Sequence, residues 1–200
     1  NNKRSGLLSV GFIFALIFAT NGTNALISNF NESIHELESR SFWKQQLVSI
    51  LLTIVLSITF IIGIILIIFS SNILNDLLTF FHLEKISPSL IEFLRFALLL
   101  ILILYSISVL YFYGPTKTRE WRFLSPGAIL ATSLILLTSF GFSFYVSNFS
   151  QYNKLYGSIG TLLIIMLWIY INAIVLIIGF ELNASLAKAK KSQKQITFNE

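Results

Sequence analysis

The sequence predicts an all-α fold, a polytopic bundle of transmembrane helices, and three observations support this prediction. Hydrophobic residues make up 55% of the 200-residue chain, charged residues only 12%, and the mean hydropathy is +0.79. The charges lie between long apolar runs rather than within them, which excludes a disordered chain and argues against a water-soluble enzyme. The runs lack the alternation of a membrane β-barrel, so helices must satisfy the backbone polar groups in lipid.

Five apolar runs are long enough to cross a membrane. A helix rises about 1.5 Å per residue, so a hydrocarbon layer of about 30 Å takes about 20 apolar residues. The runs of this length are residues 7–27, 42–70, 90–113, 124–146 and 158–183. We therefore expect a transmembrane domain at residues 1–187, followed by a basic cytoplasmic tail at residues 188–200.

The first run is the weakest, because Asn21, Thr23 and Asn24 interrupt its second half. Irregular polar backbone at membrane depth is tolerated only where it is buried in protein or lines water. We therefore expect a discontinuous first span, with Asn21 and Asn24 lining a cavity. The alternative is a helix that simply ends near Thr20.

The segments between the runs carry patterns of their own. Residues 28–40 are polar and acidic, with Glu32, Glu36 and Glu38 at helical spacings, which indicates a solvated helix or turn. Residues 72–84 place apolar and polar groups on opposite faces, which predicts a short amphipathic helix at the membrane interface. This helix would close the outer end of the bundle, and a gate or lid is the alternative.

Prolines mark the expected ends of two helices. Ser87 and Pro88 fit an N-cap and the first position of the third span. Gly114 and Pro115 should stop that span, since proline cannot continue the hydrogen-bond ladder. Pro126 fits the first turn of the fourth span.

Lysine and arginine residues predict the orientation. One side of a five-span chain, which includes the amino terminus, carries Lys3, Arg4, Lys85, Arg95 and Lys154. The other side carries the larger group, Arg40, Lys44, Lys117, Arg119, Arg122, Lys188, Lys190, Lys191 and Lys194. We therefore expect the carboxyl terminus in the cytoplasm and the amino terminus outside. At least one further helix is then expected before residue 1, and a cleaved signal peptide is the alternative.

The lysines after the last span are expected to contact anionic lipid head groups, at about 1 kcal/mol per charge. They are Lys188, Lys190, Lys191 and Lys194. Nucleic-acid binding would need a folded module beside them, so we expect no nucleic-acid partner.

Charged side chains inside the spans are candidates for function, because they are costly in lipid. Glu181, near the cytoplasmic end of the last span, is expected to pair with Arg119 or Arg122. The alternative is a proton- or substrate-linked carboxylate. For Arg95, two turns into the third span, snorkelling to head groups competes with contact to an anionic substrate or lipid phosphate.

Asn172 lies in the middle of the last span and shares a helical stripe with Trp168, Gly179 and Asn183. Small and amide side chains on one stripe predict close helix packing and an interhelical hydrogen bond from Asn172. The alternative is that Asn172 lines a cavity. Because the chain has no cysteine and its two histidines, His35 and His82, are isolated, we expect no metal site, no cofactor and no catalytic residue.

The carboxyl-terminal half carries a family resemblance. The stretch GPTKTREWRFLSPGAILAT has its matching positions at Pro115, Trp121, Pro126, Gly127 and Ala128. The stretch FSFYVSNFSQYNKLYGSIGTLLIIMLWIYINAIVLIIGFELNA has them at Phe144, Tyr145, Phe149, Tyr152, Asn153, Tyr156, Gly157, Ser158, Gly160, Trp168, Tyr170, Gly179, Glu181, Leu182, Asn183 and Ala184. In the order and spacing of these residues the chain resembles the YihY/virulence factor BrkB family of bacterial inner-membrane proteins.

The resemblance implies a six-helix bundle with both termini in the cytoplasm, of which five spans are present here. The family has carried the name ribonuclease BN, an activity that we do not expect, because hydrolysis needs metal ligands or an acid/base pair. We expect a non-enzymatic protein of the cytoplasmic membrane that transports or exports a small solute or lipid. The alternative is a membrane scaffold for envelope assembly. Membrane lipids and a second copy of the chain are the expected partners, and no substrate is identified.

Overall fold

The computed structural model describes residues 2–34, 38–80, 88–116, 123–148 and 153–197. These residues form five helices, α1 (Asn2–Ser33), α2 (Phe42–Phe80), α3 (Pro88–Tyr113), α4 (Pro126–Asn148) and α5 (Asn153–Thr197). No strand occurs within the described ranges. The all-α class predicted from hydropathy is confirmed.

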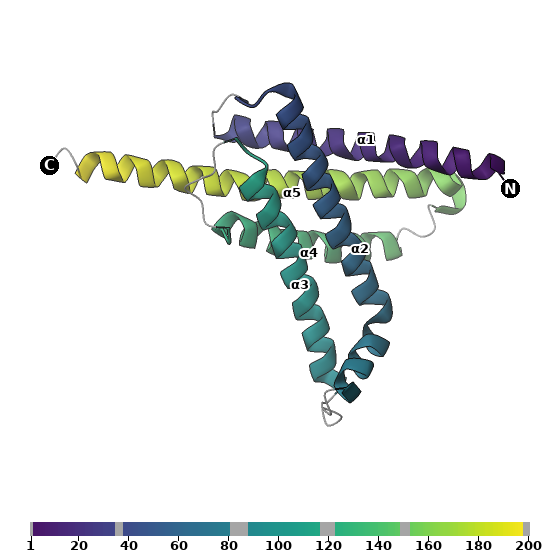
Figure 1. Ribbon diagram of the computed structural model, residues 1–200. Helices are drawn as coiled ribbons and strands as arrows, with labels where there is room; N and C mark the ends of the chain where they lie inside the picture. Colours follow the sequence, from purple (N-terminus) through teal and green to yellow (C-terminus); the bar gives the residue numbers. More distant parts are fainter. Residues whose placement is uncertain (1, 35–37, 81–87, 117–122, 149–152, 198–200) are drawn as a thin grey trace.

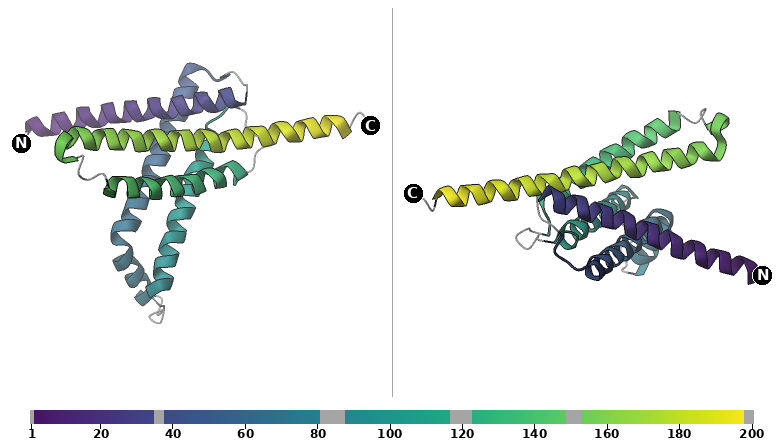
Figure 2. Two further views of the ribbon diagram at one scale, coloured as in Figure 1. Left: turned by 180° about the vertical axis from the view of Figure 1, so that it is seen from behind. Right: turned by 90° about the horizontal axis from the view of Figure 1, so that it is seen from above.

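The helices form two hairpins that are joined through α1 (Figure 1). One hairpin pairs α2 with α3 and the other pairs α4 with α5, while α1 contacts both α2 and α5. The α2–α3 hairpin runs across the direction of α1, α4 and α5 (Figure 2). The contact between α3 and α4 adds a second connection between the hairpins.

The helix ends follow local chemistry. α3 begins at Pro88 and ends at Tyr113, directly before Gly114 and Pro115, as the sequence predicts. α4 begins at Pro126, and the Ser125 hydroxyl accepts a hydrogen bond from the Ala128 backbone N–H at 3.2 Å. Ser125 is therefore the N-cap of α4.

The expected break in the first span is wrong, because α1 is one continuous helix through Asn21, Thr23 and Asn24. The Thr23 hydroxyl donates to the carbonyl of Ala19, one turn back in the same helix. The Asn24 side chain is bonded to residues of α2, so its polar group is satisfied without unwinding the backbone. Neither a discontinuity nor a helix end near Thr20 is present.

Two segments that the sequence sets apart are continuous with longer helices. Residues 72–80 are helical, but they continue α2 instead of forming a separate helix, and residues 81–84 lie outside the described residues. Residues 188–197 continue α5, so this part of the expected basic tail is helical. The membrane-interface location of residues 72–84 stays a prediction.

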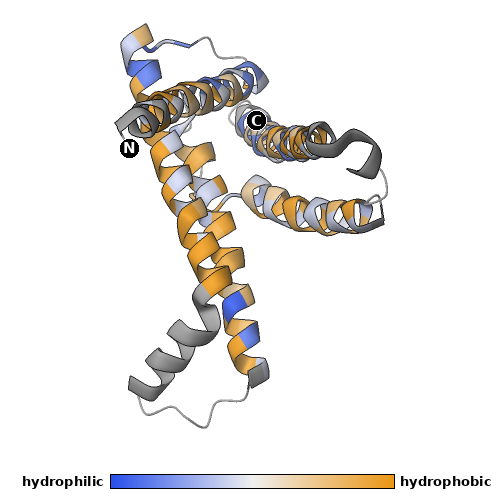
Figure 3. Ribbon diagram, turned by 90° about the vertical axis from the view of Figure 1, so that its right-hand side faces the viewer, coloured by the Kyte–Doolittle hydropathy of each residue, from blue (hydrophilic) through white to orange (hydrophobic). Residues whose placement is uncertain are grey.

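Five helices of the described chain are long and apolar enough to cross a membrane. The qualifying segments are Leu8–Ser33, Phe42–Ile68, Ser89–Tyr113, Pro126–Ser147 and Gly160–Gln193. Apolar residues dominate the α2–α3 hairpin (Figure 3), and many are exposed, including Phe60, Ile68, Phe93 and Phe96. Exposed apolar surface on this scale suits lipid rather than water.

The buried core lies where the two hairpins meet. Phe30 of α1, Tyr111 of α3 and Phe180 of α5, which we term the aromatic layer, are each at most 2% exposed. The rings of Phe30 and Phe180 stack at 4.3 Å between centroids, and Tyr111 lies edge-on to both at 5.4 Å. Because three different helices supply these rings, the aromatic layer fixes the joint between the hairpins.

Candidate functional site

A hydrogen-bonded group, which we term the loop cluster, joins the α1–α2 connection to the end of α3. It consists of Asn31, Glu38, Arg40, Gly114 and Thr116. The Arg40 guanidinium donates to both Glu38 carboxylate oxygens at 2.8 Å and to the Gly114 carbonyl at 2.7 Å. Thr116 donates through its hydroxyl to Glu38 and through its backbone N–H to the Asn31 side chain, each at 2.9 Å. Asn31 also donates to Glu38 at 2.8 Å.

The loop cluster is partly shielded from water, and this determines its electrostatics. The side chains of Arg40 and Glu38 are 17% and 20% exposed. The hydrogen bond from the Arg40 side chain outweighs the effect of burial and lowers the pKa of Glu38 from 4.5 to about 2. Glu38 is therefore a carboxylate at neutral pH, and its bidentate contact with Arg40 is a charge-assisted ion pair.

A second polar group, which we term the polar seam, lies between α1 and α2. Its members are Thr20, Thr23 and Asn24 of α1 and Gln45, Ser49 and Thr53 of α2. The Asn24 side-chain oxygen accepts from Gln45 at 2.9 Å and from Ser49 at 3.3 Å. The hydroxyls of Thr23 and Thr53 are 2.9 Å apart.

The polar seam ends at the Thr20 hydroxyl. Thr20 is only 2% exposed, and its hydroxyl oxygen has no hydrogen-bond partner within the described structure. Thr20 lies three residues before Thr23 and four before Asn24, so the three share one face of α1. All six side chains of the seam are uncharged, so the seam offers hydrogen bonds but no formal charge.

The loop cluster and the polar seam lie on the same face of α1. Asn24, Ile27 and Asn31 repeat at spacings of three and four residues, which places them in one stripe. Ile27 is fully buried between the two polar groups, and a Cβ at Gly114 would lie 3.4 Å from its side chain. From the loop inward, the order is therefore the loop cluster, an apolar layer that contains Ile27, and the polar seam.

Close packing joins α4 to α5 on the other side of the joint. The Asn183 side chain accepts from the Gly127 backbone N–H at 2.8 Å and donates to the Ser125 hydroxyl at 2.7 Å. A Cβ at Gly179 would lie 2.6 Å from the Tyr111 hydroxyl oxygen, so only glycine fits there. The Tyr111 hydroxyl donates to the Leu176 carbonyl. The contact between α4 and α5 therefore serves close helix packing, as the stripe of small residues on α5 predicts.

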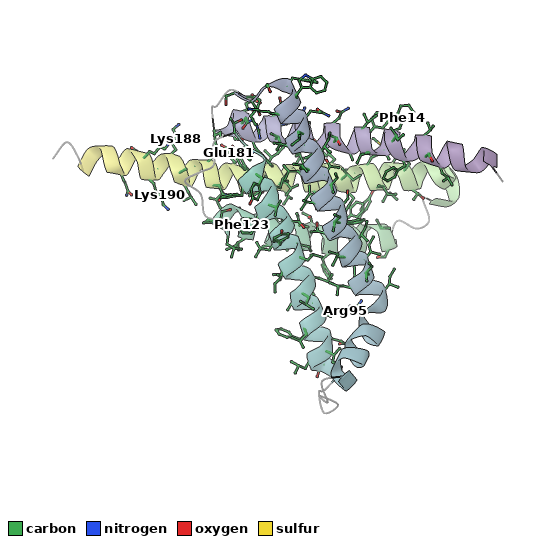
Figure 4. All side chains as sticks on the ribbon, viewed as in Figure 1. Phe14, Arg95, Phe123, Glu181, Lys188 and Lys190 are labelled. Carbon is green, nitrogen blue, oxygen red and sulfur yellow. The ribbon has the colours of Figure 1, made fainter. Side chains whose placement is uncertain are left out.

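The structure does not bring the five candidate cavity residues together. Asn24 belongs to the polar seam, whereas Asn21 is exposed on α1. Arg95 lies two turns from the start of α3, away from the crossing of the helices, and donates to the Ile67 carbonyl of α2, while Glu181 is exposed near that crossing (Figure 4). Asn172 donates to the Trp168 carbonyl of its own helix. Asn183, not Asn172, makes the interhelical hydrogen bond of that stripe.

The ion pair expected between Glu181 and Arg119 or Arg122 involves residues outside the described structure, and it stays a prediction. The lysines of the lipid-binding prediction lie on the exposed end of α5, where Figure 4 marks Lys188 and Lys190. The side-chain placement of Lys194 is not described, and contact of these lysines with lipid also stays a prediction.

Sequence reasoning missed the loop cluster and most of the polar seam. The acidic segment at residues 28–40 was expected to be solvated, but Asn31 is 3% exposed and Glu38 is held by Arg40. Gln45, Ser49 and Thr53 recur every four residues, a polar stripe in an otherwise apolar run that could have been read as a helix contact. No group of three or more His, Asp or Glu residues is placed to hold a metal within the described ranges.

Five apolar helices, with polar side chains bonded to one another between them, define a multi-pass helical membrane protein. The chain belongs to the Virulence factor BrkB family, which matches residues 1–199. The resemblance recognised in the sequence is therefore confirmed.

Relatives in several bacteria support this assignment. YfkH of Bacillus subtilis (strain 168), whose name describes it as ribonuclease-like, is 38% identical over 191 residues, which cover 96% of this chain and 70% of YfkH. A UPF0761 membrane protein of Stenotrophomonas maltophilia (strain K279a) is 33% identical over 103 residues, 52% of this chain and 22% of the relative. A UPF0761 membrane protein of Pseudoalteromonas translucida is 37% identical over 94 residues, 44% of this chain and 31% of the relative. No solved structure matches the chain.

Proposed function

We propose that the chain is part of a transporter or exporter that moves a small solute or lipid across the bacterial cytoplasmic membrane. The observation that carries the proposal is the polar seam, in which hydroxyl and amide groups of α1 and α2 face one another within membrane-spanning helices. Polar groups at membrane depth are costly and commonly mark substrate pathways. The unpartnered Thr20 hydroxyl leaves hydrogen-bonding capacity for a passing molecule.

The chemistry of the polar seam favours an uncharged hydrogen-bonding group. A charge carried into the membrane needs an opposite charge or many dipoles around it, and the six seam residues carry no charge. A hydroxyl or amide group of a solute can exchange hydrogen bonds with Thr23, Asn24 and Thr53 at little cost. In this proposal the solute passes between α1 and α2.

A membrane scaffold is the second candidate function. It is favoured by the hydrogen bonds that Asn24, Gln45 and Ser49 make with one another, because such bonds also serve simply to hold two helices together. The two functions differ in whether water reaches the seam. A transport route must be reached by water from each side in turn, whereas a packing contact stays dry.

Cysteine accessibility distinguishes the two functions, and the absence of native cysteine makes every introduced thiol unique. We would place Ser49→Cys in the polar seam and Leu51→Cys as the control, since Leu51 is 53% exposed on the same helix, on a surface that is expected to face lipid. Both variants would be reconstituted in phosphatidylethanolamine–phosphatidylglycerol vesicles and treated with a membrane-impermeant maleimide. Transport predicts labelling of Ser49→Cys from both sides and none of Leu51→Cys. A Ser49→Cys thiol that stays unlabelled from both sides would exclude the route.

We propose that the carboxyl terminus lies in the cytoplasm and that lysines such as Lys188 and Lys190 contact anionic lipid. The charge distribution of the whole sequence supports this orientation. A Ser192→Cys thiol should then be labelled in intact cells only after the cytoplasmic membrane is permeabilised. Labelling before permeabilisation would reverse the orientation. We propose no enzymatic activity and no nucleic-acid partner for the chain, and a second copy remains the expected protein partner.

A further inference from the structure

We propose that the loop cluster is a gate that closes the loop end of the polar seam, an inference that rests on the proposed transport route. The loop cluster joins segments that are remote in sequence, because Arg40 binds the carbonyl of Gly114 and Thr116 binds Asn31. Opening this end of the seam therefore means separating the α1–α2 connection from the end of α3.

The position of the loop cluster supports a gate. Asn31 lies two turns from Asn24 on the same stripe of α1, and Gln45 lies just under one turn from the start of α2. A molecule that enters the seam from the loop end must therefore pass the loop cluster and then the apolar layer that contains Ile27. The Gly114 carbonyl, which Arg40 holds, belongs to the residue that faces Ile27.

The chemistry of the loop cluster allows it to open and close. It is held by hydrogen bonds and an ion pair, and the side chains of Arg40 and Glu38 are already 17% and 20% exposed. When the cluster separates, water can replace each of these contacts, so opening does not leave stranded polar groups. The aromatic layer behind it is held by apolar packing instead and would remain as the fixed part of the joint.

The gate can be tested with the Ser49→Cys thiol as the reporter. We would compare its labelling rate, with impermeant maleimide supplied from the loop side, in the otherwise native chain and in the Glu38→Gln and Arg40→Lys backgrounds. Glu38→Gln removes the charge that Arg40 binds, and we expect labelling to become at least about tenfold faster, a factor that corresponds to roughly 1.4 kcal/mol. Arg40→Lys keeps the positive charge but loses the bidentate geometry, so we expect an intermediate increase in the labelling rate.

Two controls separate gating from general loosening. The Leu51→Cys thiol should stay unlabelled in every background, because this exposed position on a membrane-spanning helix is expected to face lipid. Thr116→Val removes one hydroxyl contact to Glu38 and should give a smaller increase, so it provides a reading if a charge variant fails to fold. Tryptophan-fluorescence melts of each variant in the vesicles would establish that it is folded.

The outcomes distinguish the gate from the route. Faster labelling of Ser49→Cys in the loop-cluster variants, while Leu51→Cys stays unlabelled, supports the gate. Equal labelling rates in all backgrounds overturn the gate but leave the transport route in place. If Ser49→Cys is not labelled in any background or from either side, both the gate and the transport route are overturned. If Ser49→Cys and Leu51→Cys are both labelled in the loop-cluster variants, the fold has loosened, and this result also overturns the gate.

Discussion

The Glu38→Gln substitution should weaken the fold at neutral pH and have progressively less effect in acid. The pKa of Glu38 is about 2 in the folded chain, against an ordinary value of 4.5. A carboxylate with a lowered folded pKa stabilises the fold above its unfolded pKa, and this contribution is lost as the pH falls from about 4.5 through 2. The difference between the two values corresponds to roughly 3 kcal/mol, which partial exposure and solvent screening reduce to about 2 kcal/mol.

The assay is an unfolding titration of both chains in mixed micelles of a mild detergent and dodecyl sulfate, followed by tryptophan fluorescence at several pH values. The native chain should be more stable than Glu38→Gln by about 2 kcal/mol at pH 7, and this gap should fall to less than about half by pH 3. Glu32 is exposed at the end of α1, so Glu32→Gln is a matched control. It should leave the stability at pH 7 and at pH 3 the same as in the native chain. A gap that keeps its size from pH 7 to pH 3 would refute the ionic origin of the effect.

Three further substitutions, two of them paired with a control substitution, test the packing of the helices, and thermal melts in detergent provide the measurement. Gly127→Ala should lower the free energy of unfolding by about 2 kcal/mol or more, because the added Cβ would overlap the Gly179 carbonyl. Gly141→Ala is the control in the same helix: its Cβ would meet no other atom within 4 Å, so the substitution should be neutral or slightly stabilising. Asn183→Ala should lower stability by about 1–3 kcal/mol, because it leaves a buried backbone N–H unpaired. Asn172→Ala should lower it by less than about 0.5 kcal/mol, since within the described residues the Asn172 side chain bonds its own helix. Equal losses for these two would contradict the interhelical role of Asn183. Thr53→Val keeps the side-chain shape and should cost about 0.6 kcal/mol, the usual value of one interhelical hydrogen bond in a membrane protein. A Thr53→Val melt identical to that of the native chain would show that the seam hydrogen bond adds nothing to stability.

Much of the fold can be predicted because its signals are local. Apolar runs identify membrane helices from composition alone, and proline fixes helix ends through its own covalent structure. Pro88 and Pro126 therefore mark the first residues of α3 and α4, and Gly114 with Pro115 marks the end of α3. None of these assignments requires a partner from elsewhere in the chain.

The continuity of α1 could not be predicted from its own residues. Asn21, Thr23 and Asn24 are poor helix formers in isolation, and their number suggested a break. Gln45 and Ser49 decide the outcome, because they satisfy the Asn24 side chain from the neighbouring helix. Tertiary contacts of this kind override local preference, and a single sequence does not show which polar residues of two helices will meet.

The loop cluster could not be predicted for a related reason. Glu38 and Arg40 are two residues apart, which by itself indicates only a solvated pair in a polar loop. Their partners Gly114 and Thr116 lie more than 70 residues further along the chain. The charge count assigned the two connections to the same side of the membrane, but it contained no information on their contact.

The two hairpins run across each other (Figure 2), and they are connected through α1, the aromatic layer and the loop cluster. The aromatic layer holds this joint through apolar contacts, whereas the loop cluster holds it through hydrogen bonds that water can replace. Asn24, Ile27 and Asn31 share one face of α1, and this face links the loop cluster to the polar seam. The part of the joint that can exchange its contacts with water is therefore also the part that adjoins the polar seam.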